Sequence, residues 1–278
     1  MMAILFLGYS LLILAAGLSP VRWLRYGLPV TLLLLLPLGG AGWSFCLLAL
    51  SYVALTAWMK EQPGPAWLAW LRGLLWFGLS LGLMVHQLPG YQGLLLAQQA
   101  VVKTGSVAVN LYLNTDKVLV AWSLLCWCPL VAPSLAKPWR FSSWWALAVA
   151  PMGIALLTLL AMASGLVDWQ PGLSPWFWLL AATNLLNTCM AEELLFRGLL
   201  LRWLQPRWGS ALALLVSSIL FGMAHLAGGW GYVGLATLAG GLYGLMLQLT
   251  GRLAPAVLCH WALNLTQLLL LTWPLSQR

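Results

Sequence analysis

Four ionisable side chains lie inside long apolar stretches of this chain, where charge is rare. Charged residues make up 6% of the 278 residues, and hydrophobic residues make up 62%. Glu192 and Glu193 are adjacent within one apolar stretch, and His225 and His260 lie within two later ones. Because an ionisable group inside a membrane span costs on the order of 3 kcal/mol, each of the four is expected to have a function or a partner.

The two glutamates differ in what a helix places beside them. Glu193 and Arg197 are four residues apart with the acid first, which is the better order for an ion pair along a helix. Glu192 is rotated by about 100° around the helix axis and therefore faces a different direction. A carboxylate at that depth that looks into a wet polar cavity is a candidate general base.

The two histidines each begin or end a four-residue spacing that places a second side chain on the same helix face. Phe221 precedes His225 by four residues, and Asn264 follows His260 by four. At about 1.5 Å per residue from the expected cytoplasmic ends, Glu192 and Asn264 lie about 15 Å deep, His225 about 22 Å and His260 about 9 Å. We therefore expect three helices to bring a carboxylate, two imidazoles and a carboxamide together.

A carboxylate and imidazoles around a wet cavity suit either water activation for hydrolysis or proton relay in a transporter. The HExxH zinc motif is absent from the sequence, and both aspartates, Asp116 and Asp168, lie in expected loops. Residues 78–82 match GxSxG around Ser80, but mid-span placement favours helix packing over a nucleophile. A transporter would show two matching halves, which the sequence lacks. The structural alternative is that these polar groups only join helices through hydrogen bonds.

The elements that must position these groups are membrane spans, which need about 20 residues each. The window at 27–38 is short and broken by Pro29 and Pro37, so it is a short or re-entrant element. We predict an all-α transmembrane bundle with about eight or nine spans, in one integrated membrane domain made of an N-terminal region (1–140) and a core (141–278). The apolar windows are 2–18, 27–38, 43–59, 67–88, 118–135, 143–166, 173–201, 210–227, 231–250 and 254–274.

Basic residues predict the orientation of the spans through the positive-inside rule. With the N-terminus outside, residues 89–117 form the longest outside loop, and the candidate site faces the cytoplasmic half of the membrane. Outside then lie Lys103, Lys117 and Arg278. The cytoplasmic side collects Arg22, Arg25, Lys60, Arg72, Lys137, Arg140, Arg197, Arg202, Arg207 and Arg252.

The other unusual residues have structural interpretations. The net charge of +8 comes from basic residues at the ends of apolar stretches, so we expect no nucleic acid partner. His86 lies at a span end and is expected to be structural, and Gly240, Gly241 and Gly244 allow close helix packing. Five cysteines are interpreted as small buried hydrophobes: Cys46, Cys126, Cys128, Cys189 and Cys259.

Three ordered motifs give the chain a resemblance to a known family. Residues 192–197 match EExxxR, residues 221–225 match FxxxH and residues 260–264 match HxxxN. In this order they resemble the CPBP family of intramembrane proteases, which includes CAAX prenyl proteases and bacteriocin-processing, Abi-like proteins. The resemblance covers residues 189–266 and does not extend to the N-terminal half.

The resemblance implies an intramembrane peptidase in a multi-pass protein, which we expect in the bacterial cell membrane. It implies that Glu192 and His225 hold and activate water, and that His260 and Asn264 stabilise the oxyanion. Glu193, Arg197 and Phe221 are then supporting residues. Partners would be the lipid bilayer and a membrane protein or peptide substrate that is membrane-associated, prenylated or of the leader type.

Two questions stay open at the level of sequence. If zinc is present, Glu192, His225 and His260 are its candidate ligands. We expect no catalytic metal, because no further carboxylate is visible to orient the two histidines. The alternative function is a catalytically silent membrane scaffold, chaperone or bacteriocin-immunity protein that keeps the motifs without cleaving a substrate.

Overall fold

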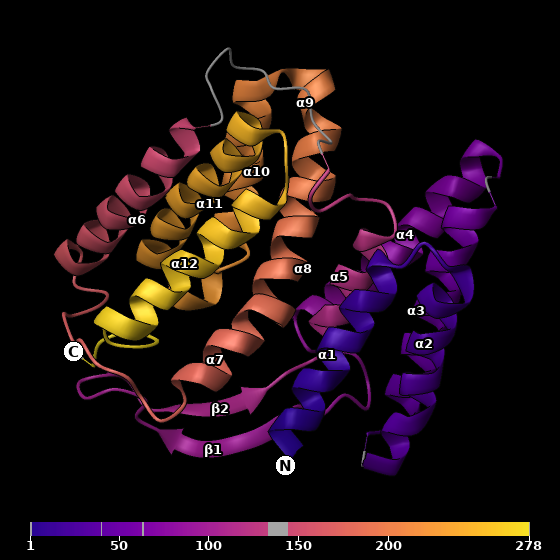
Figure 1. Cartoon of the computed structure of the whole chain (residues 1–278), viewed down its shortest axis with the longest axis horizontal. Coiled ribbons are helices and arrows are strands. Elements are labelled where there is room, and N and C mark those ends of the chain that lie inside the picture. The colour runs from indigo at the N-terminus through magenta and orange to yellow at the C-terminus, as the bar shows by residue number, and fades with distance from the viewer. Residues whose placement is uncertain (1, 40, 63, 133–143, 278) are drawn as a thin grey trace. The chain divides into compact units, whose positions relative to one another are not determined.

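The computed structural model describes residues 2–39, 41–62, 64–132 and 144–277, and most of them are helical, as predicted (Figure 1). The predicted boundary between residues 140 and 141 lies outside the described residues, as do Lys137, Arg140 and Arg278, so the division into two regions stays a prediction. The chain forms two compact units. Unit 1 contains residues 1–96, 112–127 and 186–191, and unit 2 contains residues 97–111, 128–185 and 192–278.

Unit 1 is built from the N-terminal helices. Helix α1 packs against α2 and α5, and α3 packs against α2 and α4. The GxSxG match around Ser80 lies within α4, where the Ser80 hydroxyl is buried and hydrogen-bonded to the Tyr52 hydroxyl at 2.8 Å. The helices are α1 (Met2–Leu18), α2 (Arg22–Leu35) with the 3-10 turn η1 (Leu36–Gly39), α3 (Trp43–Glu61), α4 (Ala66–Met84) and α5 (Lys117–Leu125).

Two elements of unit 1 differ from the expectation. The window at 118–135 does not form a span in its described part, because α5 has only 9 residues and ends before Cys126. Every residue of α5 after Lys117 is buried within the unit, which explains its apolar sequence without membrane crossing. The expected short element at 27–38 starts earlier, at Arg22, and runs through Pro29 before it ends in η1.

A two-stranded sheet shows that the all-α prediction is wrong in one place. Strands β1 (Leu94–Ala100) and β2 (Val109–Leu113) pair within the expected outside loop. In β2, Asn110 and Tyr112 are exposed while Leu111 and Leu113 are buried. This alternation has the period of a strand that is half-buried.

Unit 2 holds the candidate site in a group of helices around α11, which contacts α6, α10 and α12 (Figure 1). Between α6 and α10 the chain is helical from Phe177 to Trp208. The elements are α6 (Trp145–Ala163), α7 (Phe177–Thr183), η2 (Asn184–Cys189), α8 (Met190–Glu193), η3 (Leu194–Leu201), α9 (Arg202–Trp208), α10 (Ser210–Met223), η4 (Leu226–Gly228), α11 (Trp230–Thr250) and α12 (Ala254–Leu270).

The predicted helix at 173–201 contains two segments with π-helical hydrogen bonding, η2 and η3, on either side of α8. A π-turn inserts an extra residue into the helical repeat and changes which side chains share a face. Glu192 and Glu193 therefore lie on the short regular turn between two irregular ones.

Close packing of α10 on α11 depends on glycine, as the small-residue pattern predicted. A Cβ at Gly240 would lie 3.2 Å from Ser218 Cα of α10, and a Cβ at Gly244 would lie 2.4 Å from Leu214 Cδ1. The two helices can therefore approach at these positions only because the side chains are missing.

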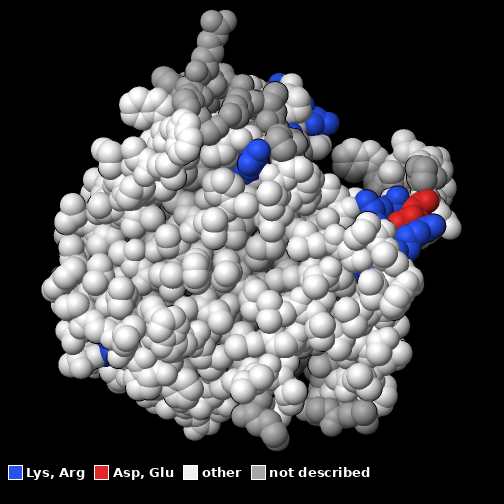
Figure 2. Space-filling model, in the orientation of Figure 1, with Lys and Arg blue, Asp and Glu red and all other residues white. Residues whose placement is uncertain are grey.

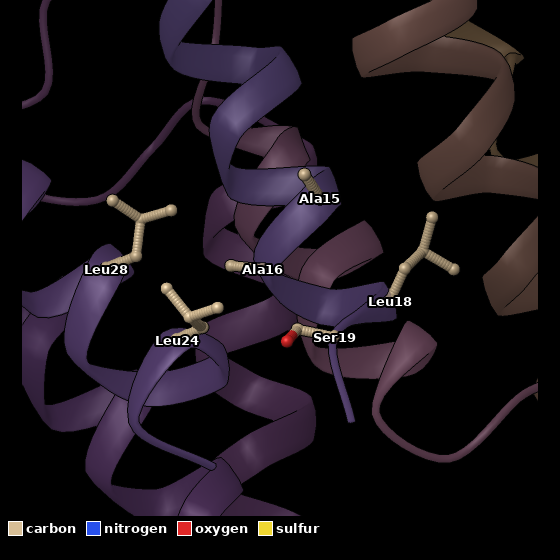
Figure 3. A pocket seen from close by; sticks show the side chains of 6 residues that line it. All are labelled: Ala15, Ala16, Leu18, Ser19, Leu24 and Leu28. Atoms are coloured by element: carbon tan, nitrogen blue, oxygen red, sulfur yellow. The ribbon is translucent and has the colours of Figure 1, made fainter. Parts of the chain in front are cut away.

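The surface of the described residues is that of a membrane protein. Figure 2 shows a face with few charged side chains. By length and composition α3, α4, α6 and α11 are candidate membrane spans, and α1, α10 and α12 are shorter apolar helices. The count of eight or nine spans stays a prediction. A pocket at the end of α1 in unit 1 offers no acid–base group (Figure 3), since it is lined by Ala15, Ala16, Leu18, Ser19, Leu24 and Leu28.

Candidate active site

Glu193 joins three helical segments of unit 2 through one carboxylate oxygen. Its Oε1 accepts a hydrogen bond from Arg197 Nη1 at 3.0 Å and lies 2.9 Å from His260 Nδ1 on α12. The other terminal nitrogen of the Arg197 guanidinium, Nη2, donates to the carbonyl oxygen of Gly240 on α11 at 2.7 Å. All three side chains are buried. The predicted ion pair is present, and the bond to His260 adds a contact that helical spacing could not show.

Glu192 faces away from that group and toward His225, as its rotation on the helix predicted. The distance from Glu192 Oε2 to His225 Nε2 is 4.0 Å. His225 lies in the turn after α10, and its Nδ1 is 2.8 Å from the carbonyl of Phe221. A carbonyl can only accept, so Nδ1 donates in this bond, and in the neutral form of the ring Nε2 is then an acceptor.

Phe221 lies between the two histidines. Its ring centroid is 4.7 Å from that of His225 and 5.7 Å from that of His260, the latter in an edge-to-face arrangement. The guanidinium carbon of Arg197 lies 4.4 Å from the same ring. The FxxxH spacing thus supplies an apolar wall that separates the Glu192–His225 pair from the buried Glu193–Arg197–His260 group.

Two residues outside the three motifs also contact site residues. The ring of Tyr243 on α11 stacks on His260 with centroids 4.5 Å apart and planes inclined by 12°. Asn184, at the start of η2, accepts a hydrogen bond from Asn264 Nδ2 at 3.1 Å. Sequence reasoning missed both. The only feature of the sequence that could have indicated Asn184 was a carboxamide in an apolar window. No feature indicated Tyr243, since aromatic residues are common in such helices.

The structure brings the predicted residues together as two groups and an amide pair. Glu192 is beside His225, and Glu193 is beside Arg197 and His260. Asn264, one turn after His260 on α12, is instead held by Asn184. The structure thus gives each of these side chains a specific neighbour, and the gathering of the carboxylate, both imidazoles and the carboxamide around one centre stays a prediction.

The donors of the site are of the kind that zinc prefers, but their arrangement does not fit it. In both histidines Nδ1 is the hydrogen-bonded ring nitrogen, so Nε2 is the nitrogen that a metal would use, as in many zinc sites. Among the residues that the structure describes, no three His, Cys, Asp or Glu side chains gather closely enough to hold a metal ion. Our sequence argument against a metal was wrong in one premise, because Glu193 is a carboxylate that orients His260. A zinc requirement stays untested.

Comparison with known families identifies the same region. Residues 174–266 match the family model described as type II CAAX prenyl endopeptidase, Rce1-like. No match was found among curated proteins or among solved structures. The matched region agrees with the resemblance of residues 189–266 to the CPBP family of intramembrane proteases, and it covers less than half of the chain. It includes all three motifs and, apart from residues 186–191, lies within unit 2.

Proposed function

We propose that this chain is an intramembrane endopeptidase that uses Glu192 and His225 to activate water, and the match of residues 174–266 to the Rce1-like family model supports this proposal. The observation that carries this proposal is the separation of 4.0 Å between Glu192 Oε2 and His225 Nε2. It is too long for a direct hydrogen bond, and it lets one water molecule lie about 2.8 Å from both atoms.

The protonation of His225 determines how that water would be held. Since Nδ1–H donates to the Phe221 carbonyl, Nε2 accepts. Glu192 also accepts, so the water donates one hydrogen to each and directs its oxygen lone pairs away from both. As the water oxygen attacks the scissile carbonyl carbon, Glu192 takes its proton and later delivers it to the leaving amine.

His260 and Asn264 are the proposed donors to the oxyanion that forms in this step. Since His260 Nδ1–H donates to the Glu193 carboxylate, Nε2 can donate only when the ring carries both protons, and Glu193 offsets the positive charge of that form. Asn264 donates one amide hydrogen to Asn184, and its second amide hydrogen is the proposed donor to the oxyanion. Each donor of this kind is worth about 3 kcal/mol in comparable sites.

The substrate class that we propose is a peptide held at the membrane, and a prenylated carboxyl terminus is the first candidate because the matched family is named for it. The test uses purified protein in liposomes with a fluorescent peptide that ends in a farnesylated CaaX sequence, and with its unprenylated twin. We expect the wild-type protein to release the terminal tripeptide from the farnesylated peptide. Equal cleavage of the twin would contradict prenyl recognition.

A second experiment tests the protease proposal without a chosen substrate. Mass spectrometry of membrane peptides from cells that express wild-type protein or Glu192→Gln reports every new carboxyl terminus. We expect a set of termini that is present only with the wild type. Identical sets would overturn the endopeptidase proposal and favour the scaffold or immunity alternative.

The proposal routes no step through a metal, which gives it a further test. We expect the purified enzyme to keep its activity after dialysis against a chelator and to contain no stoichiometric zinc. Loss of activity that is restored by zinc would instead make Glu192, His225 and His260 metal ligands.

A further inference from the structure

Tyr243 is a buried aromatic residue on α11, which carries none of the three motifs. Its ring lies almost parallel to that of His260, with centroids 4.5 Å apart and an angle of 12° between the planes. Only 1% of Tyr243 is exposed. Stacked rings at this distance attract each other beyond the burial of their area.

The Tyr243 ring is itself fixed by its surroundings. It meets Phe221 edge to face at 5.9 Å, and the guanidinium carbon of Arg197 lies 5.4 Å from its centroid. One turn earlier on α11, a Cβ at Gly240 would lie 3.0 Å from Arg197 Nη2 and 3.2 Å from Phe221 Cδ1. The absence of a side chain at Gly240 thus allows α11 to approach closely enough for Tyr243 to reach His260.

The bond from His260 to Glu193 does not by itself fix the imidazole. The hydrogen bond at Nδ1 restrains one edge of the ring, but it can stretch and bend, so small changes of the two side-chain torsions still tilt the ring plane. Such a tilt moves Nε2 away from the position where it could meet an oxyanion. The Tyr243 ring against one face of the imidazole limits this tilt.

We propose that Tyr243 is a positioning residue that holds the ring plane of His260 so that Nε2 is directed at the reacting carbonyl. This inference rests on the proposed function, in which His260 donates to the oxyanion. It assigns the role to the face of the aromatic ring and not to the hydroxyl group.

Substitution separates the ring from the hydroxyl. In the farnesylated-peptide assay, we expect Tyr243→Phe to keep most of the activity. Tyr243→Leu should lower kcat by about tenfold or more while KM stays within about twofold, because a transition-state contact is lost. Equal losses in the two variants would overturn the assignment to the ring.

Met246, one turn later on α11 and also 1% exposed, provides the matched control. Met246→Ala removes buried volume from the same helix without touching His260 in the proposal. We expect it to lower the unfolding temperature as much as Tyr243→Leu does, with kcat per folded molecule unchanged. A kcat loss equal to that of Tyr243→Leu would reduce Tyr243 to a packing residue.

A spectroscopic readout tests the stack independently of cleavage. The chain has only three histidines, so NMR of protein labelled at histidine gives a small set of ring signals, which His260→Gln assigns. The face of Tyr243 should shift the His260 ring protons upfield in the wild type and in Tyr243→Phe, and this shift should vanish in Tyr243→Leu. An unchanged His260 signal in Tyr243→Leu would overturn the inference. If Glu192→Gln kept full activity, the proposed function would fail while this measurement still reported on the stack.

Discussion

Among the described residues, an imidazole lies within hydrogen-bond distance of a carboxylate once in each unit, and only one of these two pairs has the neighbours that hydrolysis needs. In unit 2, His260 Nδ1 lies 2.9 Å from Glu193 Oε1, and in unit 1, His86 Nδ1 lies 2.6 Å from Asp116 Oδ1. By distance alone the unit 1 pair is the closer one. A short contact between an imidazole and a carboxylate therefore does not identify a catalytic centre.

The surroundings of the two pairs distinguish them. Asp116 also accepts from the backbone N–H of Lys117 at the start of α5, and His86 stacks on Tyr91, so this pair joins the end of α4 to the start of α5. The pair in unit 2 has a guanidinium on the same carboxylate and lies next to a second carboxylate and a second imidazole. The structural interpretation of His86 fits its contacts, although its partner was not predicted.

The largest expected effect in this comparison is at Glu192. Glu192→Gln keeps the size of the side chain and removes the base, so we expect cleavage of the reporter peptide to fall by about 10² to 10⁴-fold. Folding should be unaffected, as measured by thermal unfolding in the same detergent. Activity within about threefold of wild type would exclude Glu192 as the base.

Glu193→Gln should have the next largest effect, on both folding and activity. It leaves the buried Arg197 without its charge partner, which costs about 3–5 kcal/mol of folding free energy. The double variant Glu193→Gln/Arg197→Met removes both charges and should recover most of that stability. Its cleavage rate should stay on the order of 10²-fold low, because His260 has lost the carboxylate that orients it. Recovery of activity together with stability would show that Glu193 acts only through folding.

Asn184→Ala tests the hydrogen bond between Asn264 and Asn184, and it should lower activity less than the Glu193 variants do. Without Asn184 the Asn264 side chain can rotate, so we expect kcat to fall by about tenfold, equivalent to about 1.4 kcal/mol of transition-state stabilisation. The neighbouring Thr183 bonds only to backbone carbonyls of its own helix, which makes Thr183→Ala the control. Equal kcat values for the two variants would remove Asn184 from the site.

The smallest effect on activity is expected from the unit 1 pair. Asp116→Asn should lower the free energy of unfolding by about 1–2 kcal/mol, because the bonds to His86 and to the α5 backbone weaken. Cleavage per folded molecule should equal that of wild type. A loss comparable to that of the Glu193 double variant would show that unit 1 participates in the chemistry.

Local spacing predicted the parts of the site that one helix determines. The ion pair of Glu193 with Arg197, the contact of Phe221 with His225 and the separate direction of Glu192 all follow from neighbours within four residues. Spacing within one helix could not predict the contacts between helices. The bond from Glu193 to His260 joins residues 67 positions apart, and Asn184 and Asn264 are 80 apart.

The two differences in the fold have separate causes. The apolar window at 118–135 was interpreted as a membrane span, yet α5 is apolar because it is buried within unit 1. Residues 89–117 were expected to form an outside loop, and the strand β1 within them was not predicted. Hydropathy reports that a segment leaves water, and it does not distinguish lipid from the interior of the protein.

The most direct test of the central claim compares Glu192→Gln with Asp116→Asn in one cleavage assay on the farnesylated reporter peptide, with rates normalised to folded protein. We predict that Glu192→Gln lacks measurable cleavage above about 1% of wild type, which is the low end of the loss expected for a missing general base, and that Asp116→Asn retains the wild-type rate. Full activity of Glu192→Gln, or equal loss in both variants, would contradict the assignment of the catalytic centre to unit 2.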